Sequence, residues 1–250
     1  MAGAAGVGCN GALEQRRDGL CVARLVTVGV PVSTTVTIDA TEVTRRQYAE
    51  WLSRAPSVIG QDPASCSMNS EFAPEPTCVS SVGVCQGANC VSHPQVCVDW
   101  CDAKAYCAAV GKRLCGKIGG GSNAYRDSSD ATLSQWYFAC SSGGPNTFSH
   151  GSTYQPALCN TDNFTGYGTT EPVGSHSGCQ SACAFAGIFD LNGNANEWED
   201  SCMPGPAIDI CPTRGWGPNG GSLSGSCVYQ AGASPSDSHD IYLGFRCCSL

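Results

Sequence analysis

The chain has 250 residues, a formal net charge of −8 and only 14% charged residues. Such a chain lacks the basic surface that nucleic-acid binding requires, and its apolar runs are shorter than the roughly eighteen residues of a membrane span. The nineteen cysteines do not form the paired short spacings of zinc sites, so they predict disulfides. Disulfides persist in oxidising compartments, which predicts a periplasmic, cell-surface or secreted protein.

Residues 1–20 carry no periodic pattern of apolar residues, and we expect a disordered tail or the remnant of an export segment there. Small residues lead up to Cys9 and weakly resemble a lipoprotein cleavage box. Because an odd number of cysteines leaves one thiol without an intramolecular partner, one hypothesis makes Cys9 a lipid anchor. The alternative is that Cys9 pairs with Cys21 or is a free thiol of the tail.

The first regular elements are expected between residues 22 and 54. The stretch 22–38 is rich in Val and Thr and is interrupted by a glycine and a proline, which predicts one or two strands. Thr44 and Gln47 have the spacing of a capping box, and the aromatic residues that follow them fall on one helical face. A short helix is therefore predicted over residues 45–54.

Residues 55–95 have no regular pattern, and we expect a long surface loop pinned by its four cysteines. The next segment predicts a helix, because Asp99 can cap it, Asp102 lies in its acidic first turn and Gly111 provides a stop. A third short helix is predicted over residues 133–140, and turns and short strands follow it.

The domain organisation follows from these elements. No internal repeat and no linker divides the chain, so we expect one α+β domain over residues 21–250, low in regular secondary structure and rich in disulfides.

Six segments then occur in an order that resembles the landmarks of the formylglycine-generating enzyme (sulfatase-modifying factor) family, over roughly residues 30–250: ATEVTRRQYAEWL, VCVDWCDAKAYCAAVGKRL, QWYFACSSGG, GIFDLNGNANEWED, RGWGPNGGS and LGFRC. The resemblance implies a divergent bacterial member with a domain related to the C-type-lectin fold.

The segment GIFDLNGNANEWED concentrates oxygen-bearing side chains in a chain with few charges. The resemblance implies a structural calcium loop, with side-chain oxygens from Asp190 and Glu197 and backbone carbonyls from Gly193 and Ala195. Calcium takes about six to eight oxygen ligands and accepts such a mixture. The alternative is an Asn-rich turn held by its own side-chain hydrogen bonds.

The resemblance also implies a second calcium site, whose nearest match in this chain is Asn160 and Thr161. It further implies two structural disulfides, which join Cys107 to Cys247 and Cys140 to Cys227.

The catalytic cysteines of the family are not matched. The family oxidises a protein cysteine with copper(I) held by two cysteine thiolates just after a Gly-Gly-Ser landmark, and soft thiolates suit copper(I). The matching segment, residues 220–227, holds one cysteine, Cys227, where the structural cysteine belongs, and residues 228–240 contain no Lys or Arg. Copper is therefore not expected.

Three functions stay open at this point. The first is a non-catalytic module that binds a protein or glycan through the loop 223–243, with Leu223, Ser224, Ser226, Tyr229, Asp240 and Tyr242 as contact residues. The second is an oxidase with a rearranged copper site, for example Cys227 with Cys248. The third is a purely structural, disulfide-hardened surface protein. Four tryptophans, namely Trp51, Trp100, Trp136 and Trp198, are expected in the core rather than on a sugar-binding surface.

Overall fold

The computed structural model describes residues 8–30, 34–61, 66, 69–161, 168–204, 209–218, 225–235 and 238–249. The helical segments of this part are α1 (Arg45–Leu52), α3 (Pro76–Val79), η1 (Ala88–Ser92), α4 (Trp100–Ala109), η2 (Tyr125–Asp127), α5 (Gln135–Cys140) and η3 (Cys183–Phe185). The strands are β1 (Glu14–Arg17), β2 (Leu20–Ala23), β3 (Leu25–Val30), β4 (Thr34–Asp39), β5 (Arg113–Leu114), β6 (Asn196–Trp198), β7 (Ile210–Arg214), β8 (Gln230–Pro235), β9 (Leu243–Gly244) and β10 (Cys247–Ser249). In these ranges, no helix has the length and apolar character needed to cross a membrane.

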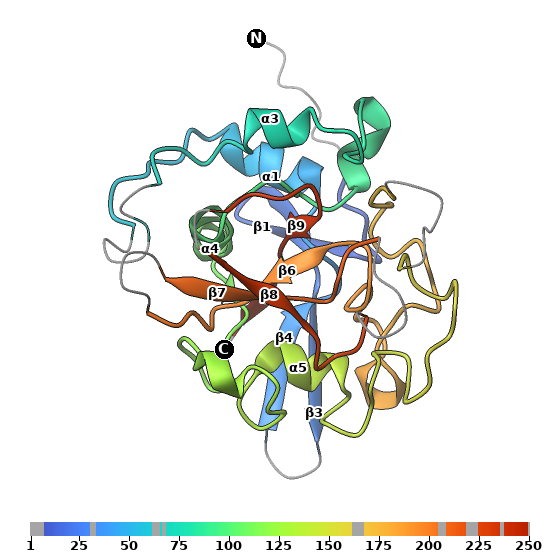
Figure 1. Cartoon of the computed structure of the whole chain (residues 1–250). Helices are drawn as coiled ribbons and strands as arrows, with labels where there is room; N and C mark the ends of the chain where they lie inside the picture. Colours follow the sequence, from blue (N-terminus) through green and yellow to red (C-terminus); the bar gives the residue numbers. More distant parts are fainter. Residues whose placement is uncertain are drawn as a thin grey trace.

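The strands form three small sheets, ordered β1-β2, β3-β4-β10-β5 and β8-β7-β6-β9 (Figure 1). Only the β6–β9 pair is parallel. The C-terminal strand β10 lies between β4 and β5, with Cys248 opposite Ile38 and Cys247 opposite Leu114. This pairing joins the C-terminal strand to β4 and β5. The turn before β10 carries Arg246, which is fully buried.

The three predicted helices are confirmed as α1, α4 and α5, with slightly later starts or earlier ends. The capping box of α1 is complete, because Thr44 accepts from the Gln47 amide and the Gln47 side chain accepts from the Thr44 amide. Asp99 and Asp102 form the same reciprocal pair at the start of α4. Ser134 caps α5. Local capping chemistry therefore sets where each helix begins.

The irregular stretch 55–95 is pinned by its cysteines, as the sequence predicts. Its disulfides are Cys66–Cys101, Cys78–Cys97 and Cys85–Cys90. It also contains η1 and α3, and α3 lies above α1 in Figure 1.

The expectation of a disordered tail over residues 1–20 is wrong for its second half. Strand β1 pairs with β2 through a turn in which Asp18 and Gly19 have positive φ. Glu14 is buried and forms an ion pair with Arg46 of α1. The sequence EQRR has no alternation of apolar and polar residues, which is the pattern that predicts a strand. This segment forms a strand because it pairs with β2. The lipid-anchor hypothesis is also contradicted, because Cys9 is bonded to Cys21.

Two main hydrophobic clusters form the core. One packs α1 and α4 together through stacked and edge-to-face rings of Tyr48, Trp51, Tyr106 and Phe245. The other packs α5 against β3 and β4, which lie beside it in Figure 1. The expectation that four tryptophans are core residues is confirmed: Trp51, Trp100, Trp136 and Trp198 are all buried.

All nineteen cysteines lie in the described residues, and eighteen of them form nine disulfides. Two of these disulfides, Cys107–Cys247 and Cys140–Cys227, are the pairs that the family resemblance implies. The remaining cysteine is Cys183, which is exposed and free. The structure is thus an α+β fold with small sheets, short helices and many covalent staples.

Candidate functional site

The acidic and Asn-rich loop before β6 is held in a tight conformation. Asp190, Gly193 and Asn194 all have positive φ. A Cβ atom on Gly193 would lie 2.6 Å from the carbonyl oxygen of Asn160, so only glycine fits at this turn. The Gly193 amide donates to the Gly215 carbonyl at 2.8 Å, and the Asn194 amide donates to the Asn160 carbonyl at 3.0 Å.

Two asparagine amides tie this loop to its surroundings. The Asn192 side chain accepts from the Ser149 amide at 2.6 Å and donates to the Gly225 carbonyl. The Asn194 side chain accepts from the Glu171 amide at 2.7 Å and donates to Glu42 Oε1 at 3.0 Å. These bonds match the Asn-rich turn that the sequence left open as an alternative.

Glu197 is held in a buried ion pair. Arg246 donates from Nε and Nη2 to both carboxylate oxygens of Glu197, at 2.7 to 2.9 Å. Trp136 Nε1 donates to Glu197 Oε2 at 2.8 Å, and both charged side chains are fully buried. This bidentate pairing orients Glu197 toward the guanidinium.

Two further buried carboxylates, those of Glu42 and Asp190, interact electrostatically with this ion pair. Burial and the charge of Asp190 raise the pKa of Glu42 well above its usual value. Burial also raises the pKa of Asp190 to about 6, against the hydrogen bond from the Gly174 amide and the charge of Arg246, which lower it. Glu42 Oε2 is buried and has no hydrogen-bond partner. Three carboxylates therefore share one buried guanidinium.

The donor set fits a hard cation only in part. Glu197 is occupied by Arg246 and Trp136, and the Gly193 carbonyl accepts from the Ala195 amide at 2.8 Å. Asp190 and the unpartnered oxygen of Glu42 have the oxygen chemistry and the excess negative charge that calcium needs. No sequence pattern marks Glu42 as a ligand, because an acidic residue just before a helix start resembles an exposed charge.

The two residues predicted for a second calcium site contact the Asn-rich loop. The Asn160 side chain donates to the Thr169 carbonyl at 3.0 Å and to Asn194 Oδ1 at 3.2 Å. Thr161 lies against Gly193, where its Cγ2 leaves no room for a Cβ. Both residues are buried.

The cysteines offered for a rearranged copper site are not free thiols. Cys227 is bonded to Cys140, and Cys248 is bonded to Cys115. The Gly-Gly-Ser landmark and residues 223–224 lie outside the described residues. Since Cys183 is the one free cysteine, no pair of thiolates is available in this oxidised chain.

The expected contact loop 223–243 is not a single exposed loop. Strand β8 occupies its middle and pairs with β7. Leu223 and Ser224 lie outside the described residues, and Ser226 and Tyr242 are buried rather than exposed. Tyr242 is fixed because its hydroxyl donates to the Gly168 carbonyl at 2.6 Å.

The other two expected contact residues lie nearer the surface. Asp240 is exposed, and Tyr229 is partly exposed. The Tyr229 ring packs edge-on against Trp216 with centroids 4.9 Å apart. Trp216, also partly exposed, is the fifth tryptophan of the chain and lies outside the core.

Asp99, Asp102 and His239 form a separate group of possible metal ligands, and their potential ligand atoms lie within 4.8 Å of one another. Asp99 and Asp102 are committed to the start of α4, and Asn69 donates to Asp102 at 3.0 Å. His239 Nε2 lies 4.0 Å from Asp99 Oδ2. The helix start accounts for both carboxylates.

This acidic pair predicts a pH dependence of stability. Burial and the charge of Asp99 raise the pKa of Asp102 to about 8 from 3.8. The folded state then holds a proton that the unfolded state has lost, so stability falls as pH rises between these values, by at most about 1.4 kcal/mol per pH unit. We expect the melting temperature to rise from pH 8 to pH 5, with a smaller rise for Asp102→Asn. An equal rise in the variant would contradict this origin.

Comparison with known proteins places the chain in a family. It matches the sulfatase-modifying factor enzyme 1-like domain over residues 27–249. Similar solved structures include PvdO from Pseudomonas aeruginosa (19% identity, 92% of this chain and 94% of that one, TM-score 0.57) and CarF (17%, 93% and 96%, 0.53). Variable protein 1 of Treponema denticola is also similar (17%, 94% and 98%, 0.51). No curated protein sequence matches it. The chain therefore belongs to the sulfatase-modifying factor enzyme 1-like family.

Proposed function

We propose that this chain is an extracytoplasmic, non-catalytic member of the family that binds a protein or glycan ligand. The observation that carries the proposal is the state of its cysteines. Eighteen of nineteen are locked in disulfides and the last, Cys183, stands alone, whereas copper(I) chemistry of the kind implied by the resemblance needs two thiolates. The nine disulfides also support an oxidising compartment.

A turnover experiment tests the absence of catalysis. We expect no conversion of cysteine to aldehyde when the purified protein is incubated with copper(I), oxygen and a peptide that carries a Cys-x-Pro-x-Arg motif. Mass spectrometry of the peptide gives the readout, and an active formylglycine-generating enzyme in the same buffer is the positive control. Many turnovers per protein would overturn the proposal and favour the oxidase alternative.

The partly exposed aromatic pair Trp216 and Tyr229 is the surface feature that best supports ligand binding. Aromatic rings offer a large, rigid contact area at low entropic cost, and they are enriched where proteins hold ligands. The rest of the large aromatic side chains discussed above are buried in the core. A sugar face or an apolar protein side chain could pack against this pair.

Binding by this pair is tested with glycan arrays and with the emission of Trp216. We expect Trp216→Ala to weaken the binding of a ligand found on the array by roughly 2 kcal/mol or more, about thirty-fold in Kd. Phe72→Leu changes a core cluster that contains neither Trp216 nor Tyr229. It serves as the control and should leave Kd unchanged. If a ligand has the same Kd for Trp216→Ala as for Phe72→Leu, the surface formed by Trp216 and Tyr229 is excluded as its binding site.

We also propose that a structural calcium ion is held by Asp190 and Glu42. The unpartnered Glu42 Oε2 and the excess of buried carboxylates over Arg246 support this assignment. Calcium would neutralise the excess charge when bound, and it would tie β6 to the start of α1. In this proposal Glu42 takes the place of Glu197 as a calcium ligand, because Glu197 is paired with Arg246.

Removal of calcium is expected to lower the melting temperature. At calcium concentrations of about 100 Kd the ion would add about 2.7 kcal/mol to the free energy of unfolding. For a domain of this size this corresponds to a rise in melting temperature of roughly 5–10 °C. Calorimetry with calcium and with EDTA at pH 7.5 measures the difference. Glu42→Gln should remove the calcium shift. Glu199→Gln should keep it, since Glu199 is equally buried and also has an unpartnered Oε2. An identical melting temperature with and without EDTA would exclude the ion.

A further inference from the structure

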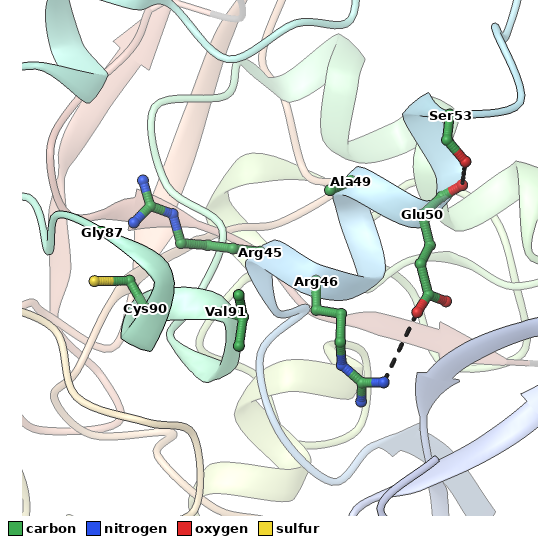
Figure 2. Close-up of a pocket in the computed structure, with 8 residues that line it drawn as sticks. All are labelled: Arg45, Arg46, Ala49, Glu50, Ser53, Gly87, Cys90 and Val91. Atoms are coloured by element: carbon green, nitrogen blue, oxygen red, sulfur yellow. Dashed lines mark hydrogen bonds and ion pairs between the residues drawn. The ribbon is translucent and has the colours of Figure 1, made fainter. Parts of the chain in front are cut away.

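A pocket of about 530 Å³ lies between α1 and η1 (Figure 2). This volume falls within the range of roughly 300–1,000 Å³ that is usual for sites that hold small organic molecules. Its wall includes Arg45 and Ala49 of α1 and Val91 of η1. Neither Trp216 nor Tyr229 belongs to the wall, so the pocket is separate from the surface proposed above for a protein or glycan.

Arg45 brings to this pocket a positive charge that no carboxylate neutralises. Its Nη1 donates to the Cys85 carbonyl at 2.6 Å. Among the residues that the structure describes, no carboxylate forms an ion pair with Arg45. Burial lowers the pKa of Arg45, which means that the loss of water disfavours its charged form.

Other arginines that are shielded from water have a carboxylate close to them. Burial acts to lower the pKa values of three such arginines, and a nearby carboxylate acts to raise each of them. These pairs are Arg113 with Asp200, Arg214 with Glu199 and Arg246 with Glu197. Arg46, the neighbour of Arg45 in α1, forms ion pairs with Glu14 and Glu50. Arg45 is therefore an exception in a chain whose acidic residues outnumber its basic ones.

The contacts of Arg246 show which edge of the Arg45 guanidinium is available. Arg246 donates from Nη1 to the Asp39 carbonyl at 3.2 Å, and its Nε and Nη2 bind the Glu197 carboxylate at 2.7 to 2.9 Å. Arg45 also uses Nη1 on a backbone carbonyl, but within the described part of the chain its Nε and Nη2 have no partner. Two such donors on one edge of a guanidinium match the two oxygens of a carboxylate.

The rest of the pocket wall favours an apolar body. In Figure 2 the Arg45 guanidinium extends toward Gly87, whereas the Arg46 guanidinium extends to the opposite side, toward Glu50. Two wall residues, Ala49 and Val91, are exposed, and Val91 keeps 49% of its surface in contact with water. Covering this apolar surface is favourable.

We propose that this pocket binds a small organic carboxylate with an apolar body. The carboxylate pairs with Nε and Nη2 of Arg45, and the apolar body covers Ala49 and Val91. One negative charge is sufficient, because Arg46, the other cation of the wall, is already paired. A phosphate monoester, which carries nearly two negative charges, would leave part of its charge without a partner.

Isothermal titration calorimetry of the whole protein with naphthalene-2-carboxylate tests the proposal. We expect a Kd of about 1 mM or tighter. Naphthalene-2-carboxamide has the same shape without the charge, and acetate has the charge without the apolar body. Each should bind at least about ten-fold more weakly, because it lacks one of the two interactions. In nuclear magnetic resonance spectra the amide signals of Ala49 and Val91 should shift on addition of the carboxylate.

Two variants test the role of Arg45. Arg45→Gln and Ala49→Glu should each weaken the binding of naphthalene-2-carboxylate at least about ten-fold. Ala49→Glu keeps the guanidinium and supplies a carboxylate four residues further along the same helix, where it can pair with Arg45. Arg126→Gln is the control, because Arg126 is exposed and is not part of the wall, and it should leave Kd unchanged. All three substitutions lower the net charge by one unit, so the overall charge cannot explain a difference between them.

Four outcomes would overturn the proposal. They are no detectable binding of naphthalene-2-carboxylate, equal binding of its amide, tighter binding of glucuronate, whose carboxylate has a polar body, and a loss of binding in Arg126→Gln as large as in Arg45→Gln. If Arg45→Gln does not fold, Ala49→Glu alone decides the role of the guanidinium. None of these measurements involves Trp216 or Tyr229, so their result is independent of the glycan-array experiment.

Discussion

Arg246→Met is expected to destabilise the protein by about 3–5 kcal/mol, because it leaves a buried carboxylate without its partner. Arg246 binds both oxygens of Glu197 and also donates to the carbonyls of Asp39 and Phe189, at 3.2 and 2.8 Å. Its positive charge also lowers the pKa values of Glu42 and Asp190, against the effect of their burial. Urea denaturation at pH 7 measures the loss directly.

Two variants show whether the unpaired charge is the cause. The double variant Glu197→Gln, Arg246→Met should recover part of the loss, since glutamine still accepts the hydrogen bond from Trp136 Nε1 without carrying a charge. Arg126→Met is the matched control, because Arg126 is exposed and its ion pair is with the neighbouring Asp127. No measurable change is expected. A double variant as unstable as Arg246→Met would assign the loss to packing instead.

Removal of the Cys107–Cys247 disulfide is expected to cost about 5 kcal/mol, on the chain-entropy treatment of a loop this long. The two cysteines are separated by 140 residues and join α4 to β10. Both are fully buried. We expect the variant Cys107→Ala, Cys247→Ala to unfold at a much lower urea concentration than the unmodified protein.

The short disulfide Cys85–Cys90 gives the comparison for this variant. Its separation of 5 residues predicts a cost of about 2 kcal/mol for Cys85→Ala, Cys90→Ala. The difference between the two double variants, about 3 kcal/mol, follows from loop length alone. Equal losses would mean that strain or packing, and not loop closure, determines what each disulfide contributes.

The sequence predicts well those features that depend on neighbours along the chain. The reciprocal bonds of Thr44 with Gln47 and of Asp99 with Asp102 occur where the capping pattern places them, because a capping box needs only four consecutive residues. The burial of the four core tryptophans also followed from composition and spacing. The order of six short motifs was enough to predict the family, which the match over residues 27–249 supports.

Strand β1 shows where local patterns were not enough. Glu14 is part of a polar strand that has no apolar alternation, and its burial depends on Arg46 and Gln47 of α1, more than thirty residues away. The same holds for the stretch 223–243, which looks like a polar loop until β8 pairs with β7. A strand with a weak local signal is fixed by its partner.

The sequence by itself determined the fold class and the helix starts. It also led us to expect an oxidising compartment, and it shows that the segment 220–227 holds a single cysteine. The tertiary structure alone decided which charges meet, because Glu197 and Arg246 are 49 residues apart and Asn194 reaches Glu42 across 152 residues. It also decided that Cys9 is paired and Cys183 is free. The physical reason is the same in each case: pattern encodes local backbone preference, whereas buried charge and thiol chemistry depend on distances that only the packed chain defines.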